Sequence, residues 1–458
     1  MAQVKLNRFI ALVTLIAALG GFLFGFDMAV VSGIIEPVKL QYGLSSSQEG
    51  LFVSCALLGC IAGVAFSGYL SDKIGRKKVL FIAAFLFLIS AIGFAFSKDY
   101  GGLILFRILA GLAVGVASNV SPLYISEIAP AHKRGGLVTF YQLAITVGIL
   151  CAYLSNLFLQ RNAAAYTGSG DGVFHWLFIE NPWRGMFLVG VIPALAFASL
   201  LLIVPESPRW LVQYGKSDSA LAILTKTSGK NNAIIELKAI QEMAAQEKSS
   251  FAELLQLPLR KLLALAMTLT ALSQLSGING VIFYGPTIMK SAGIVSSDAL
   301  FYQVILGIAN MIFTFFAILK VDSWGRRPLY LYGSLCAAIA LALTGVCFWM
   351  NITGWLMLGC IIFFLLFFSL SLGPLKFVIS TEIFPTHIRG TALSVCIMTM
   401  WVSDYLVNLL FPVMRDRFGI AVTFFIFSFF CILSFFYAKS KLIETKGKSL
   451  EEIEKMLA

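Results

Sequence analysis

Long apolar runs separated by short polar turns are the feature that most constrains this chain. A run of roughly 20 residues suffices for a helix to cross about 30 Å of hydrocarbon. Of the 458 residues, 59% are hydrophobic and 12% are charged, more apolar surface than a soluble core can bury. The runs are apolar on every face, unlike the alternating strands of a membrane β-barrel. The sequence predicts an all-α membrane protein with twelve spans near residues 9–34, 48–70, 78–97, 101–123, 136–158, 184–204, 260–289, 299–320, 327–350, 353–379, 390–412 and 419–439.

Two short motifs occur twice, in the same order and at nearly the same separation. SDKIGRKK at 71–78 returns as VDSWGRRP at 321–328, an offset of about 250 residues. SEIAPAHKRG at 126–135 returns as TEIFPTHIRG at 381–390, an offset of about 255 residues. The chain is therefore predicted to be two copies of one six-helix unit. We expect pseudo-symmetric bundles at 1–204 and 259–440, a cytoplasmic linker with short helices at 205–258, and a cytoplasmic C-terminal helix in 441–458.

Lysine and arginine gather in every second loop, which places those loops and both termini on the cytoplasmic side. The net charge of +11 is then a topology signal. It does not predict nucleic-acid binding, because no basic patch is interleaved with base-stacking aromatics on a soluble domain. The sequence also shows no Ser-His-Asp set, metal-ligand spacing or phosphate-binding glycine loop. We therefore expect no enzyme, no cofactor and no metal site.

Three longer motifs stand at specific places among the runs. PESPRWL at 205–211 follows the sixth run, LSQLSGINGVIFYGP at 272–286 lies in the seventh, and GPLKFVISTEIFP at 373–385 ends the tenth. With the duplicated loops, they make nearly the whole chain resemble the sugar porter family of the major facilitator superfamily. That family includes bacterial proton-coupled xylose and hexose symporters and animal facilitative glucose carriers. The resemblance implies two bundles that rock about a central site. We expect a bacterial-type cytoplasmic membrane, and a functional monomer because one chain holds both halves of the pore.

The duplicated loops carry charges that suit a gate. Asp72 and Arg76 lie at a helix-to-helix turn, and Glu127 and Arg134 lie in the next cytoplasmic turn. These charges can pair across helix ends and separate when that side opens. The alternative is plain membrane anchoring, with exposed pairs that contribute about 0 to 1 kcal/mol. The resemblance extends this gating charge network to Glu206, Arg209, Asp322, Arg326, Glu382 and Arg389.

Asp27 lies in the first span, where an uncompensated carboxylate costs at least about 2.5 kcal/mol. A carboxyl in such surroundings can load and release protons. Arg107 in the fourth span is the natural partner. The resemblance implies that this pair couples proton movement to transport. A static pair that fixes two helices is the alternative.

Sugar hydroxyls require neutral amides that both donate and accept hydrogen bonds, and an aromatic face for the ring. Gln274 and Asn279 are about 140° apart on an ideal helix, so they share a cavity only if the helix bends or unwinds near Gly277. Any one amide could instead be an interhelical hydrogen bond. The resemblance places a sugar site at Phe24, Gln142, Gln274, Asn279, Tyr284, Asn310, Phe377 and Trp401.

Two charges depart from the family pattern, Lys376 in the tenth span and Asp404 in the eleventh. We expect a mutual ion pair that neutralises two costly charges. If Lys376 instead faces the cavity unpaired, an anionic substrate such as a sugar acid is favoured.

The sequence thus predicts a secondary active transporter that imports a small sugar, a pentose or hexose, by proton symport through alternating access. Its partners would be the sugar, protons and the lipid bilayer, without nucleic acid. The alternatives are a facilitative sugar or polyol uniporter and a transporter of an anionic sugar acid.

Overall fold

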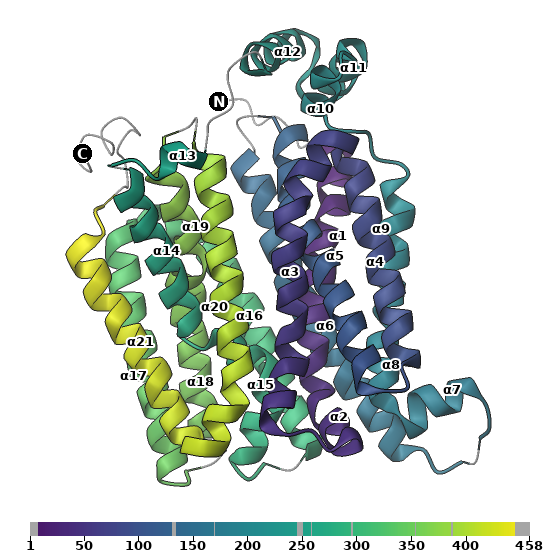
Figure 1. Ribbon diagram of the computed structural model, residues 1–458, viewed down its shortest axis with the longest axis vertical. Coiled ribbons are helices and arrows are strands. Elements are labelled where there is room, and N and C mark those ends of the chain that lie inside the picture. The colour runs from purple at the N-terminus through teal and green to yellow at the C-terminus, as the bar shows by residue number, and fades with distance from the viewer. Residues whose placement is uncertain are drawn as a thin grey trace. The chain divides into compact units, whose positions relative to one another are not determined.

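The computed structural model describes residues 8–130, 134–168, 170–244, 251–257, 259–294, 296–352, 354–385 and 388–444. These ranges are built from helices joined by short turns and contain no strand (Figure 1). Twelve of the described helical stretches are long and apolar enough to cross a membrane. The predicted all-α, twelve-span class is therefore confirmed. Of the segment 441–458 that was predicted to hold a C-terminal helix, residues 445–458 lie outside the described residues.

The first half of the sequence supplies six of the twelve spans. They are formed by α1, α3, α4, α5, α6, and α8 together with α9. The helices run in the order α1 (Arg8–Val30), η1 (Val31–Gly33), α2 (Ile35–Tyr42), α3 (Ser46–Ile74), α4 (Arg76–Phe96), α5 (Tyr100–Ile128), α6 (Arg134–Ala165), α7 (Val173–His175), the π-helical turn η3 (Trp176–Glu180), α8 (Pro182–Leu188) and α9 (Val191–Leu201).

Short linker helices follow and then the six spans of the second half. The linker contains α10 (Pro208–Gln213), α11 (Ser217–Ser228), α12 (Lys230–Ala244) and α13 (Phe251–Leu254). The second half contains α14 (Leu259–Leu275), α15 (Ile278–Ser291), α16 (Ser296–Trp324), α17 (Arg326–Trp349), α18 (Trp355–Phe367), the π-helical turn η4 (Phe368–Leu372), α19 (Gly373–Glu382), α20 (Arg389–Phe418) and α21 (Ile420–Lys441).

Most spans begin and end within a few residues of their predicted bounds, for example Asp298–Leu319 for 299–320 and Arg326–Trp349 for 327–350. The fifth span departs from its prediction, because α6 continues to Ala165 instead of ending near 158. The extra turns are polar and exposed at their end, so hydropathy alone could not assign them to a helix.

Glycine sets the turn in each copy of the duplicated loop. Gly75 has φ of +100° between α3 and α4, and Gly325 has φ of +83° between α16 and α17. A side chain is disfavoured at such positive φ values, whereas glycine adopts them readily. The glycine lets one helix stop and the next begin without a loop. Arg76 and Arg326 are consequently the first residues of their helices.

The seventh span is broken between Gln274 and Asn279, the two amides that share a cavity only if this helix bends. α14 ends at Leu275, Gly277 has φ of +80° in the left-handed region, and α15 begins at Ile278. A Cβ atom on Gly277 would stand 2.3 Å from the ring of Phe427. Only glycine satisfies both the backbone angle and this close packing. The structure thus meets the condition under which Gln274 and Asn279 can face one cavity.

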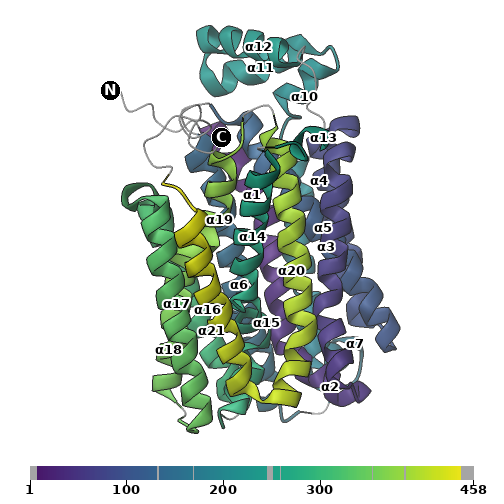
Figure 2. The same cartoon turned by 60° about the vertical axis from the view of Figure 1, so that its left-hand side comes forward.

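The chain clusters into two compact units, each built from several segments. The first comprises Met1–Met28, Leu58–Ala152 and Arg184–Glu247, and within it α4 packs against α5 and α9. In the same unit, α11 and α12 lie side by side (Figure 2). The second comprises Ala29–Leu57, Tyr153–Trp183 and Lys248–Ala458, and within it α17 packs against α18 and α21, and α14 against α20. The second unit thus takes in two segments from the first half of the sequence.

Candidate functional site

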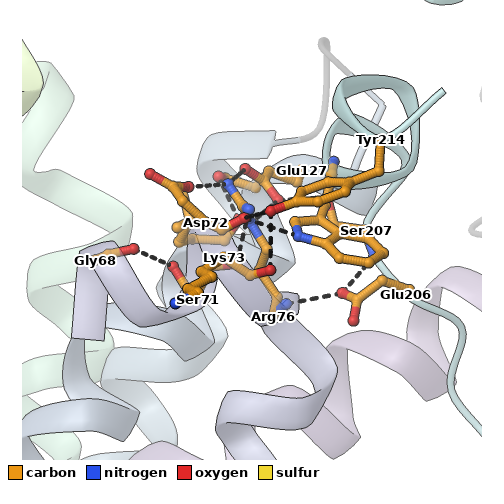
Figure 3. Close-up of polar contacts among 12 residues, drawn as sticks. Gly68, Ser71, Asp72, Lys73, Arg76, Glu127, Glu206, Ser207 and Tyr214 are labelled. Carbon is orange, nitrogen blue, oxygen red and sulfur yellow. Dashed lines mark hydrogen bonds and ion pairs between the residues drawn. The ribbon is translucent and has the colours of Figure 1, made fainter. Parts of the chain in front are cut away.

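Arg76 is the centre of a charge network in the first unit (Figure 3). Its Nε donates to Glu127 Oε2 at 2.9 Å and its Nη2 donates to Glu127 Oε1 at 3.1 Å. Asp72, one turn earlier on α3, accepts from Nη2 at 3.0 Å. The side chains of Arg76 and Glu127 are almost completely buried, whereas that of Asp72 is half-exposed. The paired, planar geometry makes Arg76 and Glu127 the strong element of the network.

Glu206 binds the same turn from the other side. Its carboxylate accepts hydrogen bonds from the backbone N–H groups of Arg76 at 2.9 Å and Lys77 at 3.1 Å. These N–H groups open α4 and have no partner within the helix, so an anion stabilises them and the helix dipole. A Cβ atom at Gly75 would lie 2.3 Å from Glu206 Oε2. The glycine therefore also makes room for the carboxylate.

Aromatic residues of α10 attach the linker to the end of α3. Trp210 Nε1 donates to the carbonyl of Asp72 at 3.0 Å, and the Tyr214 hydroxyl donates to the carbonyl of Lys73 at 2.9 Å. Ser207 donates its hydroxyl to the Glu127 carboxylate. Sequence reasoning missed Ser207, although its place directly after Glu206 in PESPRWL was the available signal.

The second half builds an equivalent network within the second unit. Arg326 Nη2 donates to Glu382 Oε1 at 2.9 Å, and its Nε donates to the same oxygen at 3.1 Å. The backbone N–H groups of Arg326 and Arg327 donate to Glu444 at 3.0 and 3.1 Å. Glu444 thus has the role toward α17 that Glu206 has toward α4. It was missed because its signal is only a glutamate that follows the last span of the half and precedes a hydroxyl residue.

The remaining residues that were predicted to join the gating charge network differ in the contacts they form. Arg389 donates through Nε and Nη2 to the carbonyl of Phe384 at 3.3 Å. Arg209 lies on α10 and forms no ion pair or hydrogen bond with any residue that the structure describes. The side chains of Arg134 and Asp322 lie outside the described part of the chain.

Asp27 and Arg107 meet inside the first unit, as the prediction paired them. Arg107 Nη1 donates to Asp27 Oδ2 at 3.1 Å and to the Asp27 carbonyl at 3.4 Å. Arg107 is completely buried, and its guanidinium carbon lies 5.5 Å from the centroid of the Phe187 ring. Its Nε and Nη2 are buried and have no hydrogen-bond partner among the described residues. One nitrogen alone therefore holds the carboxylate.

Three of the four predicted site amides belong to the second unit. Across the Gly277 break, Asn279 Nδ2 donates to Gln274 Oε1 at 3.3 Å. Asn310 on α16 accepts a hydrogen bond from the Ser369 hydroxyl at 3.1 Å. The break therefore brings Gln274 and Asn279 together. The fourth amide, Gln142, is exposed on α6 in the first unit.

The aromatic residues predicted for the sugar site differ in how far their side chains are exposed. Tyr284 is completely buried, its hydroxyl donates to the carbonyl of Asn408 at 3.0 Å, and its ring stacks on Phe411. Trp401 is buried on α20, whereas Phe377 on α19 is exposed and Phe24 on α1 is half-buried. The Tyr284 hydroxyl is thus already used in holding α15 to α20.

Lys376 and Asp404 are both buried in the second unit. The Lys376 ammonium lies 5.2 Å from the centroid of the Phe377 ring, and Asp404 attracts it electrostatically. The Asp404 carboxylate accepts from Asn408 Nδ2 at 2.8 Å and also interacts with Asn279. No salt bridge to Lys376 forms among the described residues, so the attraction between the two charges acts over more than salt-bridge distance. Their predicted ion pair stays a prediction.

Comparison with known proteins finds relatives that match nearly the whole length of the chain. The chain is 40% identical to the arabinose-proton symporter of Bacillus subtilis (strain 168) over 450 residues, which are 98% of this chain and 95% of that protein. It is 36% identical to the D-xylose-proton symporter of Escherichia coli (strain K12) over 480 residues, 98% of this chain and 96% of that protein.

Solved structures agree with these relatives. The inward-open conformation of the xylose transporter XylE from E. coli matches with a TM-score of 0.84 at 35% identity, covering 98% of this chain and 99% of that one. XylE bound to 6-bromo-6-deoxy-D-glucose matches with a TM-score of 0.79 at 35% identity, covering 99% and 100%. The sugar (and other) transporter family model matches residues 13–457. The chain belongs to this family of multi-pass membrane transporters, the sugar porters of the major facilitator superfamily.

Proposed function

We propose that the chain imports a pentose or hexose together with a proton, in a bacterial-type cytoplasmic membrane. Two full-length relatives are named for proton symport of arabinose and xylose. The observation that carries the proposal is the buried pair of Asp27 and Arg107. A carboxylate in a membrane span is costly and needs a function or a partner that offsets it. Here Arg107 binds the Asp27 carboxylate through only one nitrogen.

The geometry of this pair suits proton loading. Protonation of Asp27 removes its charge and weakens a single contact with Arg107 Nη1, so little structure has to change. A carboxylate held by both arms of a guanidinium would resist protonation more strongly. The two unused donors of Arg107 can then bind another acceptor while Asp27 is neutral. Loss of the proton restores the original pair.

The sugar would bind to the amides that the family motifs single out. Gln274 and Asn279 already exchange a hydrogen bond, and Asn310 is bound to Ser369. Sugar hydroxyls replace such bonds one for one, because both groups donate and accept. Gln142 and Phe24 would contribute from the first half, and Phe377 and Trp401 would face the sugar ring. Tyr284 would support this site by fixing α15 against α20.

Alternating access would come from two six-helix bundles at 1–204 and 259–440. By the positive-inside rule, both termini and the linker would lie in the cytoplasm. The networks around Arg76 and Arg326 would then stand at the cytoplasmic ends of their helices and loosen when that side opens. One chain holds both bundles, so we propose that a monomer in the lipid bilayer is active.

Lys376 favours one second candidate function, transport of an anionic sugar acid. Its buried ammonium forms no salt bridge within the described ranges, and a carboxylate on the substrate would supply one. The ion pair with Asp404 is the main proposal, because the two charges already attract each other. In that case both charges neutralise one another inside the bundle and the substrate is neutral.

Uptake into liposomes tests the proposal. Purified protein is given labelled arabinose, xylose, glucose, galactose or glucuronate, with an inward proton gradient and again after a protonophore. We expect one neutral sugar to accumulate above equilibrium and the accumulation to collapse with the gradient. Equilibration without accumulation would show a uniporter instead. Accumulation of glucuronate alone would favour the sugar-acid function.

A further inference from the structure

Glu49 is the most completely enclosed member of a further cluster of charges, which shares no residue with the Asp27 pair or the Arg76 network. It lies in the first turn of α3, and 1% of its side chain is exposed. Arg415 Nη1 donates to Glu49 Oε1 at 3.0 Å and Nη2 donates to Oε2 at 3.1 Å. Lys39 Nζ donates to the same Oε2 at 2.6 Å. Glu49 therefore compensates two cations at once.

Arg415 is also bound by a second carboxylate. Its Nε donates to Asp416 Oδ1 at 2.7 Å, and Asp416 in turn accepts a hydrogen bond from the Ser46 hydroxyl. We call Lys39, Ser46, Glu49, Arg415 and Asp416 the Glu49 cluster. It contains two positive and two negative charges, so it is neutral as long as it stays together. Planar, two-armed pairing of this kind is the strongest form of ion pair in proteins.

The Glu49 cluster connects segments that are distant in the sequence. Lys39, Ser46 and Glu49 come from the first repeat, whereas Arg415 and Asp416 end α20 of the second repeat. All five belong to the second compact unit, which takes in residues 29–57. The cluster is therefore a bond between the two repeats, unlike the Arg76 and Arg326 networks, which each form within one repeat.

Neighbouring contacts join the same two repeats. Glu36 on α2 pairs with Lys290 at the end of α15. The Tyr153 hydroxyl on α6 donates to the carbonyl of Ile282 at 2.9 Å. Beside Glu49 itself, a Cβ atom on Gly50 would lie 2.2 Å from a backbone oxygen of α20. The start of α3 is thus packed directly against α20, and water is kept from the ion pair.

The direction of α3 places the cluster at one face of the membrane. Glu49 lies in the first turn of this 29-residue helix and Asp72 in its last turn. At a rise of about 1.5 Å per residue, the two ends are roughly 40 Å apart, which is the thickness of a bilayer with its headgroups. The Glu49 cluster therefore lies at the face opposite to the Asp72 and Arg76 turn.

We propose that the Glu49 cluster is a lock between the two repeats, which closes this face of the membrane and opens once in each transport cycle. The inference rests on the proposed alternating access, because a contact between two rocking halves has to break when its own face opens. The Arg76 and Arg326 networks stabilise the ends of helices within each half. The Glu49 cluster, by contrast, is what the opening of this face must separate.

Helix ends make the lock reversible. Glu49 stands at the N-terminus of α3, where the helix dipole favours an anion, and Arg415 stands in the last turn of α20, where it favours a cation. Each ion keeps a favourable helix end after separation, and water then reaches both. Asp416 also remains next to Arg415 on α20. A buried pair without these partners would be too costly to open in every cycle.

Spin-label distance measurements test the lock without any sugar. All eight native cysteines are replaced, and labels are attached at Ser47→Cys and Phe418→Cys, exposed positions at the start of α3 and the end of α20. We expect Glu49→Gln to increase the ratio of the long-distance to the short-distance population by about tenfold, because loss of its ion pairs with Lys39 and Arg415 shifts a two-state equilibrium. Glu180→Gln is the matched control, because the exposed Glu180 pairs only with His175 in the described residues. It should leave the distances unchanged.

A second variant keeps the test decisive if Glu49→Gln does not fold. Arg415→Lys keeps the charge but loses the two-armed geometry, so a smaller shift in the same direction is expected. A folded Glu49→Gln or Arg415→Lys protein with the wild-type distances would overturn the lock. The labels report on opening alone. A shift in distance in the variants, with no sugar accumulation by the wild-type protein, would keep the lock and reject the proposed symport. Sugar accumulation by the wild-type protein, with no shift in the variants, would keep the symport and reject the lock.

Discussion

Arg107 holds Asp27 through a single nitrogen, Nη1, and two further donors of its buried guanidinium find no partner in the part of the chain that the structure describes. Buried polar atoms are rarely left in this state. The arrangement leaves Arg107 with spare donors next to the carboxylate that would gain and lose the proton in the proposed symport. Function at this pair can therefore be separated from folding by a substitution that changes one atom.

Asp27→Asn should abolish accumulation of sugar and leave exchange of sugar across the liposome membrane intact. Asparagine has the shape of aspartate and still accepts from Arg107 Nη1, but it cannot release a proton. Counterflow of labelled sugar and gradient-driven uptake measure the two activities. Asp99→Asn is the control, because Asp99 caps α5 by accepting from the N–H of Gly102 and asparagine caps equally well. Accumulation by the Asp27→Asn protein would contradict proton coupling at this residue.

Glu127→Gln should destabilise the protein by about 3 to 5 kcal/mol, because it leaves the Arg76 charge buried without its main partner. Asp72→Asn should cost less than about 1 kcal/mol, because the Asp72 side chain is half-exposed. Thermal unfolding in detergent compares the two variants with the wild type. Equal losses from both substitutions would show that burial of Glu127 contributes nothing to the network.

Gly277→Ala combines two penalties, a positive φ and a Cβ atom 2.3 Å from the Phe427 ring. Gly293→Ala carries only the first, since Gly293 has φ of +78° with open space around it. The Gly293 variant should lose about 1 to 2 kcal/mol of stability, and the Gly277 variant clearly more. The Gly277 variant should also lose sugar binding, because the added Cβ atom would distort the helix break that brings Gln274 and Asn279 together. Sugar binding by both variants as in the wild type would argue against the broken helix as part of the site.

Lys376→Met and Asp404→Asn test the proposed mutual pairing. Each single variant leaves one buried charge uncompensated, whereas the double variant removes both. The double variant should therefore transport better than the poorer single variant. Uptake of the same sugar by the three proteins gives the comparison. A double variant no better than the poorer single would end the pairing hypothesis and favour contact between Lys376 and an anionic substrate.

The spans were predictable from the sequence because each one must satisfy its own requirement for length and apolarity. The break at Gly277 could be stated only as a condition, because two amides five residues apart share a cavity only if the helix between them bends. Both are local properties. Each can be read from one stretch of sequence, whichever other segment packs against it.

Partners that are distant along the chain could not be predicted in this way. Glu49 and Arg415 are 366 residues apart, and nothing in either local sequence indicates the other. Glu444 stands in a weak repeat of the Glu206 environment, which becomes visible only when both carboxylates are seen to accept from the first N–H groups of α4 and α17. The single-nitrogen contact at Asp27 likewise follows from side-chain packing around Arg107, not from its position in the sequence.

Glu206 and Glu444 have a consequence for how the two repeats can diverge. Each carboxylate caps a helix of its own repeat, so the charge network of one repeat is complete without any residue of the other. A substitution in one copy leaves the second copy untouched, and the two can drift apart in strength. We therefore expect substitutions in a single repeat to adjust the strength of one network independently of the other, while the duplicated scaffold stays the same.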